Sequence, residues 1–269
     1  FYVSLLSPVK NVLRIRITSI EFPNNYYIFT AARQNVSLEV LYDKASPKRV
    51  AVTVPEGNYT ACEMADALGA ELKAAGLTWL GVAFDEVSGR FTFSGSQYFA
   101  LNTAFSSFDR PFDYGLGYHL GFTRGTHVSA KTVVSPPTYT VVSDTCANFA
   151  GDNYVFLRVN DFNCVRQTVK ITDAEGRVVE TNNDFNALAK VVLREPKNFM
   201  AFDDYASQHA KEVVFPAPTD LSRLHVEVLD AYGTPLDLCA SQLSFSIEVL
   251  EVRNLSLYNA IRDSLAVLY

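Results

Sequence analysis

Apolar and polar residues alternate along many short stretches of the chain. Residues 13–18 place leucine and isoleucine on one face and arginine and threonine on the other, and residues 36–40, 224–228 and 243–249 repeat this pattern. A period of two is typical of a β-strand with one face on a core and the other face exposed. The pattern therefore predicts a protein built mainly from β-strands.

Turn-forming residues separate these stretches. Gly89 supplies the left-handed position of a hairpin over residues 84–91, and prolines fall at strand margins, where a missing N–H does least harm. Many short strands separated in this way favour a β-sandwich or a barrel. They are numerous enough for one sandwich or for two compact ones, and because no clear linker divides them we expect one domain. Further strands are predicted at 25–30, 48–54, 78–84, 90–95, 131–142, 154–160, 165–171, 185–193 and 211–215.

Two helices are predicted among the strands. Thr60 and Glu63 form the sequence signature of a capping box, and Gly76 lies where a left-handed C-terminal cap is expected, so one helix covers about 60–76. A second helix is predicted from Leu255 to the end of the sequence. Its aligned apolar residues are Leu257, Ile261, Leu265 and Leu268. Residues 101–130 are glycine-rich and are predicted to form an elaborated loop.

Composition excludes several classes of protein. The chain has 269 residues, of which 48% are hydrophobic and 19% charged, a balance that excludes intrinsic disorder. The net charge is -6 and no basic run occurs, so we expect no direct binding of nucleic acid. No stretch approaches the ~18 uninterrupted apolar residues that predict a membrane-spanning helix.

Motifs for nucleotide and metal binding are not found. Residues 115–121 hold three glycines, but three residues separate the second from the third, whereas a dinucleotide fingerprint needs two. The four histidines lack the spacing that fixes two imidazoles on one face, although His119 and His127 could meet in the irregular loop. His225 alternates with core residues and is expected to point outward. No cofactor and no metal ligand is predicted.

Catalytic patterns are missing as well. There is no nucleophile elbow, and the acidic pairs Asp109 with Asp113 and Asp203 with Asp204 are interpreted as solvated loop residues. No catalytic residue is therefore predicted. Four scattered cysteines are interpreted as buried free thiols: Cys62, Cys146, Cys164 and Cys239.

The outward strand faces and the chain ends indicate contacts with other proteins. Ser244, Ser246 and Glu248 give one strand a mixed polar outer face suited to docking. The apolar segment 1–10 is expected to be a contact arm, and the helix over 253–269 is expected to bury apolar area against a neighbour. The profile favours an interaction protein.

A series of blocks, in the same order, resembles the minor capsid and penton-type proteins of nucleocytoplasmic large DNA viruses. Residues 145–200 contribute least to this resemblance, and each block by itself is also ordinary β-turn sequence. The blocks are residues 13–27, 52–60, 84–93, 116–122, 221–230, 233–236 and 245–249.

The resemblance implies a jelly-roll β-sandwich over residues 11–252, without catalytic residues, between the arm 1–10 and the C-terminal helix 253–269. It implies a minor capsid protein that sits under or between trimers of the major capsid protein in an icosahedral double-stranded DNA virus. The implied partners are the major capsid protein, other minor capsid proteins and copies of the chain itself. The implied location is the virion capsid, assembled in the host cytoplasm, at the fivefold vertex or in the inner lattice.

Two other functions remain open from the sequence. A carbohydrate-binding β-sandwich would present aromatic rings on an exposed face, and the candidates are Tyr26, Tyr27, Tyr114 and Tyr118. A glycoside hydrolase or lyase on a jelly roll would use a carboxylate pair such as Asp109 and Asp113.

Overall fold

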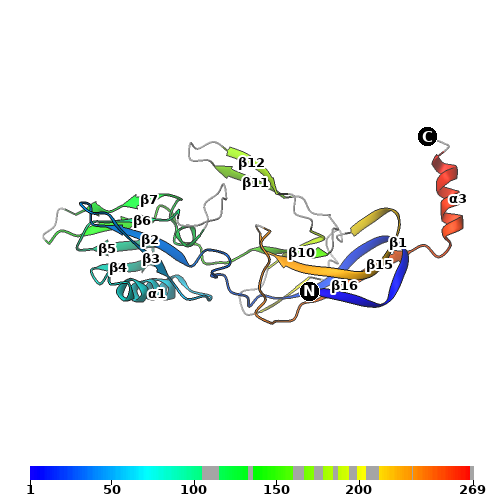
Figure 1. The fold of residues 1–269 in the computed structure, drawn as a ribbon, viewed down its shortest axis with the longest axis horizontal. Helices are drawn as coiled ribbons and strands as arrows, with labels where there is room; N and C mark the ends of the chain where they lie inside the picture. Colours follow the sequence, from blue (N-terminus) through cyan, green and yellow to red (C-terminus); the bar gives the residue numbers. More distant parts are fainter. Residues whose placement is uncertain are drawn as a thin grey trace. The chain divides into compact units, whose positions relative to one another are not determined.

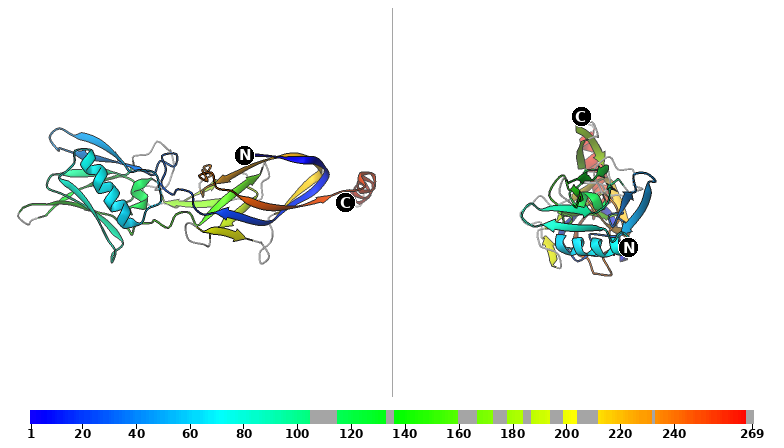
Figure 2. Two further views of the ribbon diagram at one scale, coloured as in Figure 1. Left: turned by 90° about the horizontal axis from the view of Figure 1, so that it is seen from below. Right: turned by 90° about the vertical axis from the view of Figure 1, so that its left-hand side faces the viewer.

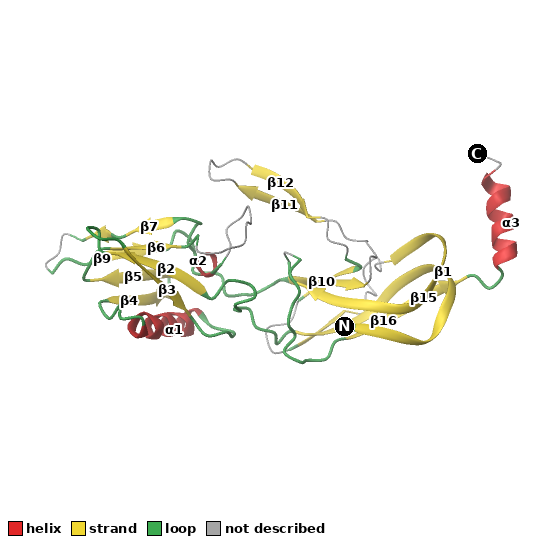
Figure 3. Ribbon diagram, in the orientation of Figure 1, coloured by secondary structure: helices red, strands yellow, loops and turns green. Residues whose placement is uncertain are grey.

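A computed structural model shows a chain made mainly of antiparallel strands with few helices (Figures 1 and 3). It describes residues 1–104, 115–132, 136–159, 167–172, 178–183, 187–193, 199–203, 212–231 and 233–266. This structure confirms the predicted all-β class, a jelly-roll-like sandwich with an inserted helix and a C-terminal helix. The chain forms two compact units. Unit 1 is Phe1–Tyr26, Asp152–Val169 and Glu180–Tyr269, and unit 2 is Tyr27–Gly151 and Lys170–Val179.

Unit 2 is a two-layer β-sandwich. One sheet has the order β3-β2-β6-β7 and the other has the order β4-β5-β9-β8. Buried side chains of both sheets, such as Leu38 and Phe93, belong to one hydrophobic core. The strands are β2 (Ser37–Tyr42), β3 (Lys48–Thr53), β4 (Leu80–Asp85), β5 (Arg90–Gly95), β6 (Phe99–Asn102), β7 (Thr126–Val128), β8 (Ala130–Lys131) and β9 (Tyr139–Val142).

The predicted helix is α1 (Ala61–Ala74), which packs on β4 and β3 at the side of this sandwich (Figure 2). The capping box is formed: the Thr60 side chain accepts from the Glu63 N–H at 3.2 Å, and the Thr60 N–H donates to the Glu63 carboxylate at 2.8 Å. Met64, Leu68 and Leu72 are fully buried. One face of the helix thus completes the core, as its spacing predicts.

Within the predicted loop 101–130, the structure forms the end of β6, the short helix α2 (Leu116–His119) and the strand β7. This segment is therefore more ordered than expected, and part of it lies outside the described residues. A further pair of strands, β11 (Gln167–Thr172) and β12 (Val178–Asn183), forms a small sheet of its own.

Unit 1 is built around two long strands that bend together. β1 (Tyr2–Pro23) and β15 (Glu212–Leu229) are antiparallel, and their register shifts at several points between Ser4 and Arg14 (Figure 1). At one of these points Asn11 has a φ of 56° and its N–H donates to the Asp220 carboxylate at 3.0 Å. Such irregularities bend and twist a strand pair.

Five further elements complete unit 1. The sheet order is β13-β10-β15-β1-β14, and β16 pairs with β1. Buried side chains of β1, β10 and β15 form the core, for example Ile17, Leu157 and Val226. The elements are β10 (Tyr154–Val159), β13 (Ala189–Val192), β14 (Met200–Asp203), β16 (Ser244–Glu251) and α3 (Leu255–Ala266). No helix in the described part of the chain is long and apolar enough to cross a membrane.

Residues 1–10 are not a free arm, because they form the first part of β1. The Phe1 ammonium group donates to the Val226 carbonyl at 2.9 Å, and the Val226 N–H donates to the Phe1 carbonyl at 2.8 Å. The boundaries of the two units also differ from the expected division into 1–10, 11–252 and 253–269. The predicted strand at 25–30 is wrong: it is a loop with one isolated bridge, between Phe29 and Gly57, where the chain passes from unit 1 into unit 2.

Candidate interaction site

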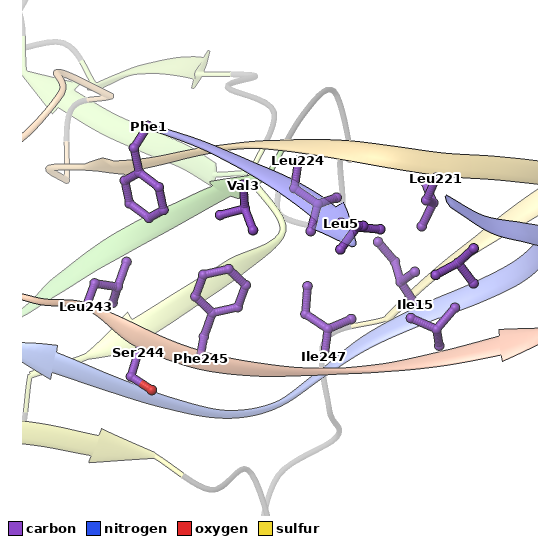
Figure 4. A pocket seen from close by; sticks show the side chains of 12 residues that line it. Phe1, Val3, Leu5, Ile15, Leu221, Leu224, Leu243, Ser244, Phe245 and Ile247 are labelled. Atoms are coloured by element: carbon purple, nitrogen blue, oxygen red, sulfur yellow. The ribbon is translucent and has the colours of Figure 1, made fainter. Parts of the chain in front are cut away.

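An apolar cavity of about 500 Å³ lies in unit 1 between the first part of β1 and strand β16 (Figure 4). We call it the β1–β16 slot. Its lining is apolar apart from the hydroxyl of Ser244. The lining residues are Phe1, Val3, Leu5, Val9, Ile15, Leu221, Leu224, Leu243, Ser244, Phe245, Ile247 and Val249.

The alternation of side chains along two strands builds this slot. Phe1, Val3 and Leu5 project into it from one wall, and Phe245 and Ile247 face them from the other wall (Figure 4). Successive side chains of a strand point to opposite faces, so the residues between them turn away from the slot. The two walls are thus the inner faces of two layers whose side chains do not fill the space between them.

The slot is open because each wall ends in an edge strand. Among the strands that the structure describes, β16 is paired with β1 alone, along residues 12–21 of β1. The first part of β1 is paired with β15 alone, through residues such as Val3 with Leu224. Both edges therefore present backbone N–H and C=O groups in a form that another chain can pair with.

Exposure differs strongly between the floor and the mouth of the slot. Ile15 at the floor is 1% exposed, whereas Phe1 at the mouth is 58% exposed. Leu6, next to the slot, is fully exposed. Unfilled apolar volume costs about 24 cal/mol per Å³, and covering apolar surface gains about 25 cal/mol per Å². A partner that supplies apolar side chains to the slot would therefore be stabilised there.

The outer face of the β16 wall is polar, as the sequence predicts. Ser244 and Ser246 are exposed. The Glu248 carboxylate pairs with Arg14 at 3.2 Å and also with Arg16, while Arg14 reaches Glu212 at 3.5 Å. These ion pairs connect β15, β1 and β16 across one face. Because the side chains are about one third exposed or more, each pair contributes little stability.

An aromatic cluster holds the other wall in place. The Tyr2 ring stacks on His225 with a centroid distance of 4.4 Å, and the Arg223 guanidinium lies 3.8 Å from the Tyr2 centroid. His225 also lies 3.8 Å from a Glu227 oxygen. His225 points outward from β15, as predicted from the alternation, and its ring anchors the start of β1.

The two loop histidines contact different backbone carbonyl groups. His119 Nδ1 is 2.9 Å from the Asn148 carbonyl oxygen, while His127 Nε2 is 2.9 Å from the Thr123 carbonyl oxygen. His127 Nδ1 also lies 3.7 Å from the Asp144 carboxylate. No group of three metal-binding side chains occurs among the residues that the structure describes.

Hydrogen bonds within a turn lower the pKa of the Asp144 carboxyl. Burial acts to raise the pKa of this carboxyl, but hydrogen bonds from the Thr123 N–H and hydroxyl, both 2.9 Å, outweigh burial and hold the pKa below its usual value. The carboxylate therefore stabilises a turn of unit 2.

Of the tyrosines considered for sugar binding, the three that the structure describes differ in their exposure. Tyr26 is fully buried in unit 1, whereas Tyr27 is 44% exposed in unit 2. Tyr118 packs against the neighbouring ring of His119 at 5.5 Å. Other residues considered from the sequence lie outside the described part of the chain: Tyr114, Asp109, Asp113, Asp204, His209 and Cys164.

The cysteines that the structure describes are free, as predicted, but exposed rather than buried: Cys62, Cys146 and Cys239. Cys62 lies on the solvent side of α1, where its thiol donates to Glu86 at 3.4 Å. This hydrogen bond is the main cause that raises the pKa of the thiol, so Cys62 has little thiolate character.

Sequence reasoning did not find the β1–β16 slot. The sequence does contain the pattern of its two walls, since apolar residues occupy every second position in residues 1–5 and in residues 243–249. The missing information was that these two segments, more than 200 residues apart, face each other across one cavity.

Comparisons with known proteins were made with both the sequence and the fold. No family model and no curated protein matches the sequence. Among solved structures, the chain is similar to the mavirus penton protein, with 10% sequence identity and a TM-score of 0.43 over 93% of this chain and 88% of that chain. It is also similar to a chain in the cryo-electron microscopy structure of the Sputnik virophage, with 11% identity and a TM-score of 0.37 over 92% of this chain and 90% of that chain.

Proposed function

We propose that this chain is a structural, non-enzymatic component of a virus capsid. In this proposal it is a minor capsid protein of a large icosahedral double-stranded DNA virus. It stabilises the shell through contacts with trimers of the major capsid protein and with other minor capsid proteins. It is located in the virion capsid, which is assembled in the host cytoplasm.

The observation that carries the proposal is the open β1–β16 slot. It combines two edge strands with an apolar interior. An extended segment of a neighbour can add to such an edge through backbone hydrogen bonds and place alternate side chains inside. A shell protein needs this kind of surface, because its contacts are repeated by symmetry.

The chemistry of the slot supports a binding role. Its lining side chains are apolar apart from Ser244, a composition that suits the binding of apolar side chains of a partner. Among the described residues, the three carboxylates whose pKa is lowered serve local structure: Glu63 caps α1, Asp85 accepts hydrogen bonds in the β4–β5 turn, and Asp144 accepts from Thr123. The blocks that resemble penton-type capsid proteins also include residues 245–249, which lie in β16.

The proposal is tested by purifying intact particles from infected cells and quantifying their proteins by mass spectrometry. We expect the chain at a fixed ratio to the major shell protein, retained through a salt wash that removes loosely bound protein. Its absence from intact particles, or a ratio that varies between preparations, would contradict the proposal. Soluble host proteins measured in the same samples serve as the control for carry-over.

A further inference from the structure

The free edge of strand β16 is uninterrupted. The strand runs for eight residues, Ser244–Glu251, without a proline or a lysine. Its pairing with β1 shifts register at two points, and at both of them the extra residue belongs to β1, so β16 itself continues without a bulge. Folded proteins commonly interrupt an edge strand with a proline, a lysine or a bulge, which prevents pairing with other chains. An uninterrupted edge of this length is therefore suited to receive another strand.

The free edge of β1, on the other wall of the slot, is interrupted. Between the pairings of Ser4 and Val9, β1 advances five residues while β15 advances only two, so the first part of β1 bulges here. Pro8 in this bulge has no N–H to donate, and the side chain of Leu6 in the same bulge is fully exposed. These features oppose the addition of a strand. Backbone pairing is thus expected at β16, while β1 contributes apolar side chains.

The inner face of β16 determines which side chains a partner strand must supply. Phe245 and Ile247 point into the slot but are only half-buried, because the slot in front of them is unfilled (Figure 4). A strand of eight residues that pairs with β16 places about four side chains on this face. Four side chains share a slot of about 500 Å³, so each fills about 125 Å³. Truncating one buried leucine in a protein core leaves a cavity of about 150 Å³, so side chains of the size of valine or leucine fit the slot.

We propose that β16 receives an extended segment of a different protein, whose apolar side chains, at every second position, enter the β1–β16 slot. The segment adds to the sheet of unit 1 through backbone hydrogen bonds with β16. Its remaining side chains lie beside Ser246 and Glu248 on the polar outer face. This inference rests on the proposed function, because it names the chemistry of the partner at the same slot.

The described residues of a second copy of this chain do not offer such a segment. All sixteen strands that the structure describes already pair with another strand of their own copy. The apolar side chains of β16 face the slot of the copy to which they belong. Edge-to-edge pairing of two β16 strands would therefore join two sheets and leave both slots unfilled. A segment of another protein, which has no such slot of its own to line, satisfies the edge and the slot together.

The first test measures the binding of synthetic peptides to the full chain by isothermal titration calorimetry. One peptide alternates valine with serine or lysine over eight residues, and a control peptide of the same composition groups its valines together. We expect the alternating peptide to bind at least about tenfold more tightly, because only alternation places every valine in the slot. N-methylation of every second residue removes the N–H groups of one peptide edge, so one of the two methylated forms should lose binding and the other should keep it. Equal binding of the two unmethylated peptides, or no binding of the alternating one, overturns the proposal.

The second test locates the bound peptide. Leu5 lines the slot on the wall opposite β16, whereas Leu6 is fully exposed beside it. Leu5→Asp should weaken binding of the alternating peptide at least about tenfold, and Leu6→Asp should leave it unchanged. Amide exchange of the parent chain gives a readout that does not depend on the folding of the variants: the peptide should slow exchange in residues 244–250 more than in residues 2–9. Equal peptide binding by the two folded variants, or protection confined to residues 2–9, would refute the proposal.

Failure of this inference can be told apart from failure of the capsid role. A chain that is present at a fixed ratio in intact particles but does not bind the alternating peptide keeps the capsid role and loses the strand donor. Light scattering on the isolated chain tests the other occupant. Association that is lost in Leu5→Asp but kept in Leu6→Asp would show that a second copy fills the slot, and it would contradict a donor from another protein.

Discussion

The Tyr26 hydroxyl donates to the Asp152 carboxylate at 2.9 Å. Tyr26 is the last residue of unit 1 before the segment 27–151, and Asp152 is the first residue of unit 1 after that segment. The hydrogen bond therefore ties together the two ends of the segment that is inserted between β1 and β10. The Tyr26 ring is fully buried and meets the Phe22 ring edge-on at 5.9 Å.

Tyr26→Phe should weaken unit 1. The substitution removes the hydroxyl and leaves the partly buried Asp152 carboxylate without this donor, which should lower the free energy of unfolding by about 1–3 kcal/mol. Tyr27→Phe is the matched control, because Tyr27 is 44% exposed and should tolerate the loss of its hydroxyl. Chemical denaturation measures both. Equal stability of the two variants would show that the Tyr26 hydrogen bond is unimportant.

Deleting residues 1–10 should lower the unfolding temperature, contrary to what a free contact arm would predict. The deletion removes the pairing of Phe1 with Val226 and takes one wall from the β1–β16 slot. Removing residues 253–269 is the control, because α3 packs on little of its own chain and the unfolding temperature should stay the same. Calorimetry distinguishes the two ends. An N-terminal deletion as stable as the full chain would restore the arm interpretation.

Thr60→Ala should destabilise unit 2 by about 1 kcal/mol through loss of the helix cap, and Thr60→Ser should preserve most of its stability. The backbone and side-chain hydrogen bonds of Thr60 lower the pKa of the Glu63 carboxyl below its unfolded value. A lowered pKa means that this contribution is complete above the unfolded pKa and is lost as the pH falls through the folded pKa. Thr60→Ala keeps the backbone N–H that lowers the pKa of Glu63 most, so the pH test uses Glu63→Gln, which should lose less stability than the parent as the pH falls. Parallel pH profiles for the variant and the parent would contradict this role of the cap.

Gly121→Ala should destabilise unit 2 more than Gly76→Ala does. Both glycines have a positive φ, 86° and 82°, so the backbone strain of the two substitutions is matched. A Cβ at Gly121 would lie 2.3 Å from the Thr145 carbonyl oxygen, whereas a Cβ at Gly76 meets open space. The clash should cost about 1–3 kcal/mol beyond the strain. Thermal unfolding gives the comparison, and similar losses for the two variants would argue against a tight approach at Gly121.

Local sequence signals predicted the parts of the fold that depend on neighbouring residues. The capping box at Thr60 and the apolar face of α1 were found because helix signals lie within a few positions of each other. The sequence also predicted the alternating strands, including the outward position of His225. The strand predicted at 25–30 failed because the chain leaves unit 1 at Tyr26 and enters unit 2 at Tyr27, and no local pattern reveals such a boundary.

Long-range pairing could not be predicted from these local patterns. β15 was expected as two separate strands because prolines lie between them, at positions 216 and 218. In the structure both prolines fall within one strand, near the place where β1 and β15 bend together, and prolines in sheets are accepted at such irregularities. The two walls of the β1–β16 slot are likewise far apart in the sequence, so local alternation predicts each wall but not the cavity between them.

Hydrogen–deuterium exchange tests most directly whether the open side of unit 1 is the surface that docks in a shell. The backbone amides of residues 2–9 and 244–250 are compared between the isolated chain and intact particles. We expect protection to rise in both segments on assembly, while the buried strand β10 exchanges equally slowly in both states. Unchanged exchange in these two segments, with new protection elsewhere in the chain, would contradict it.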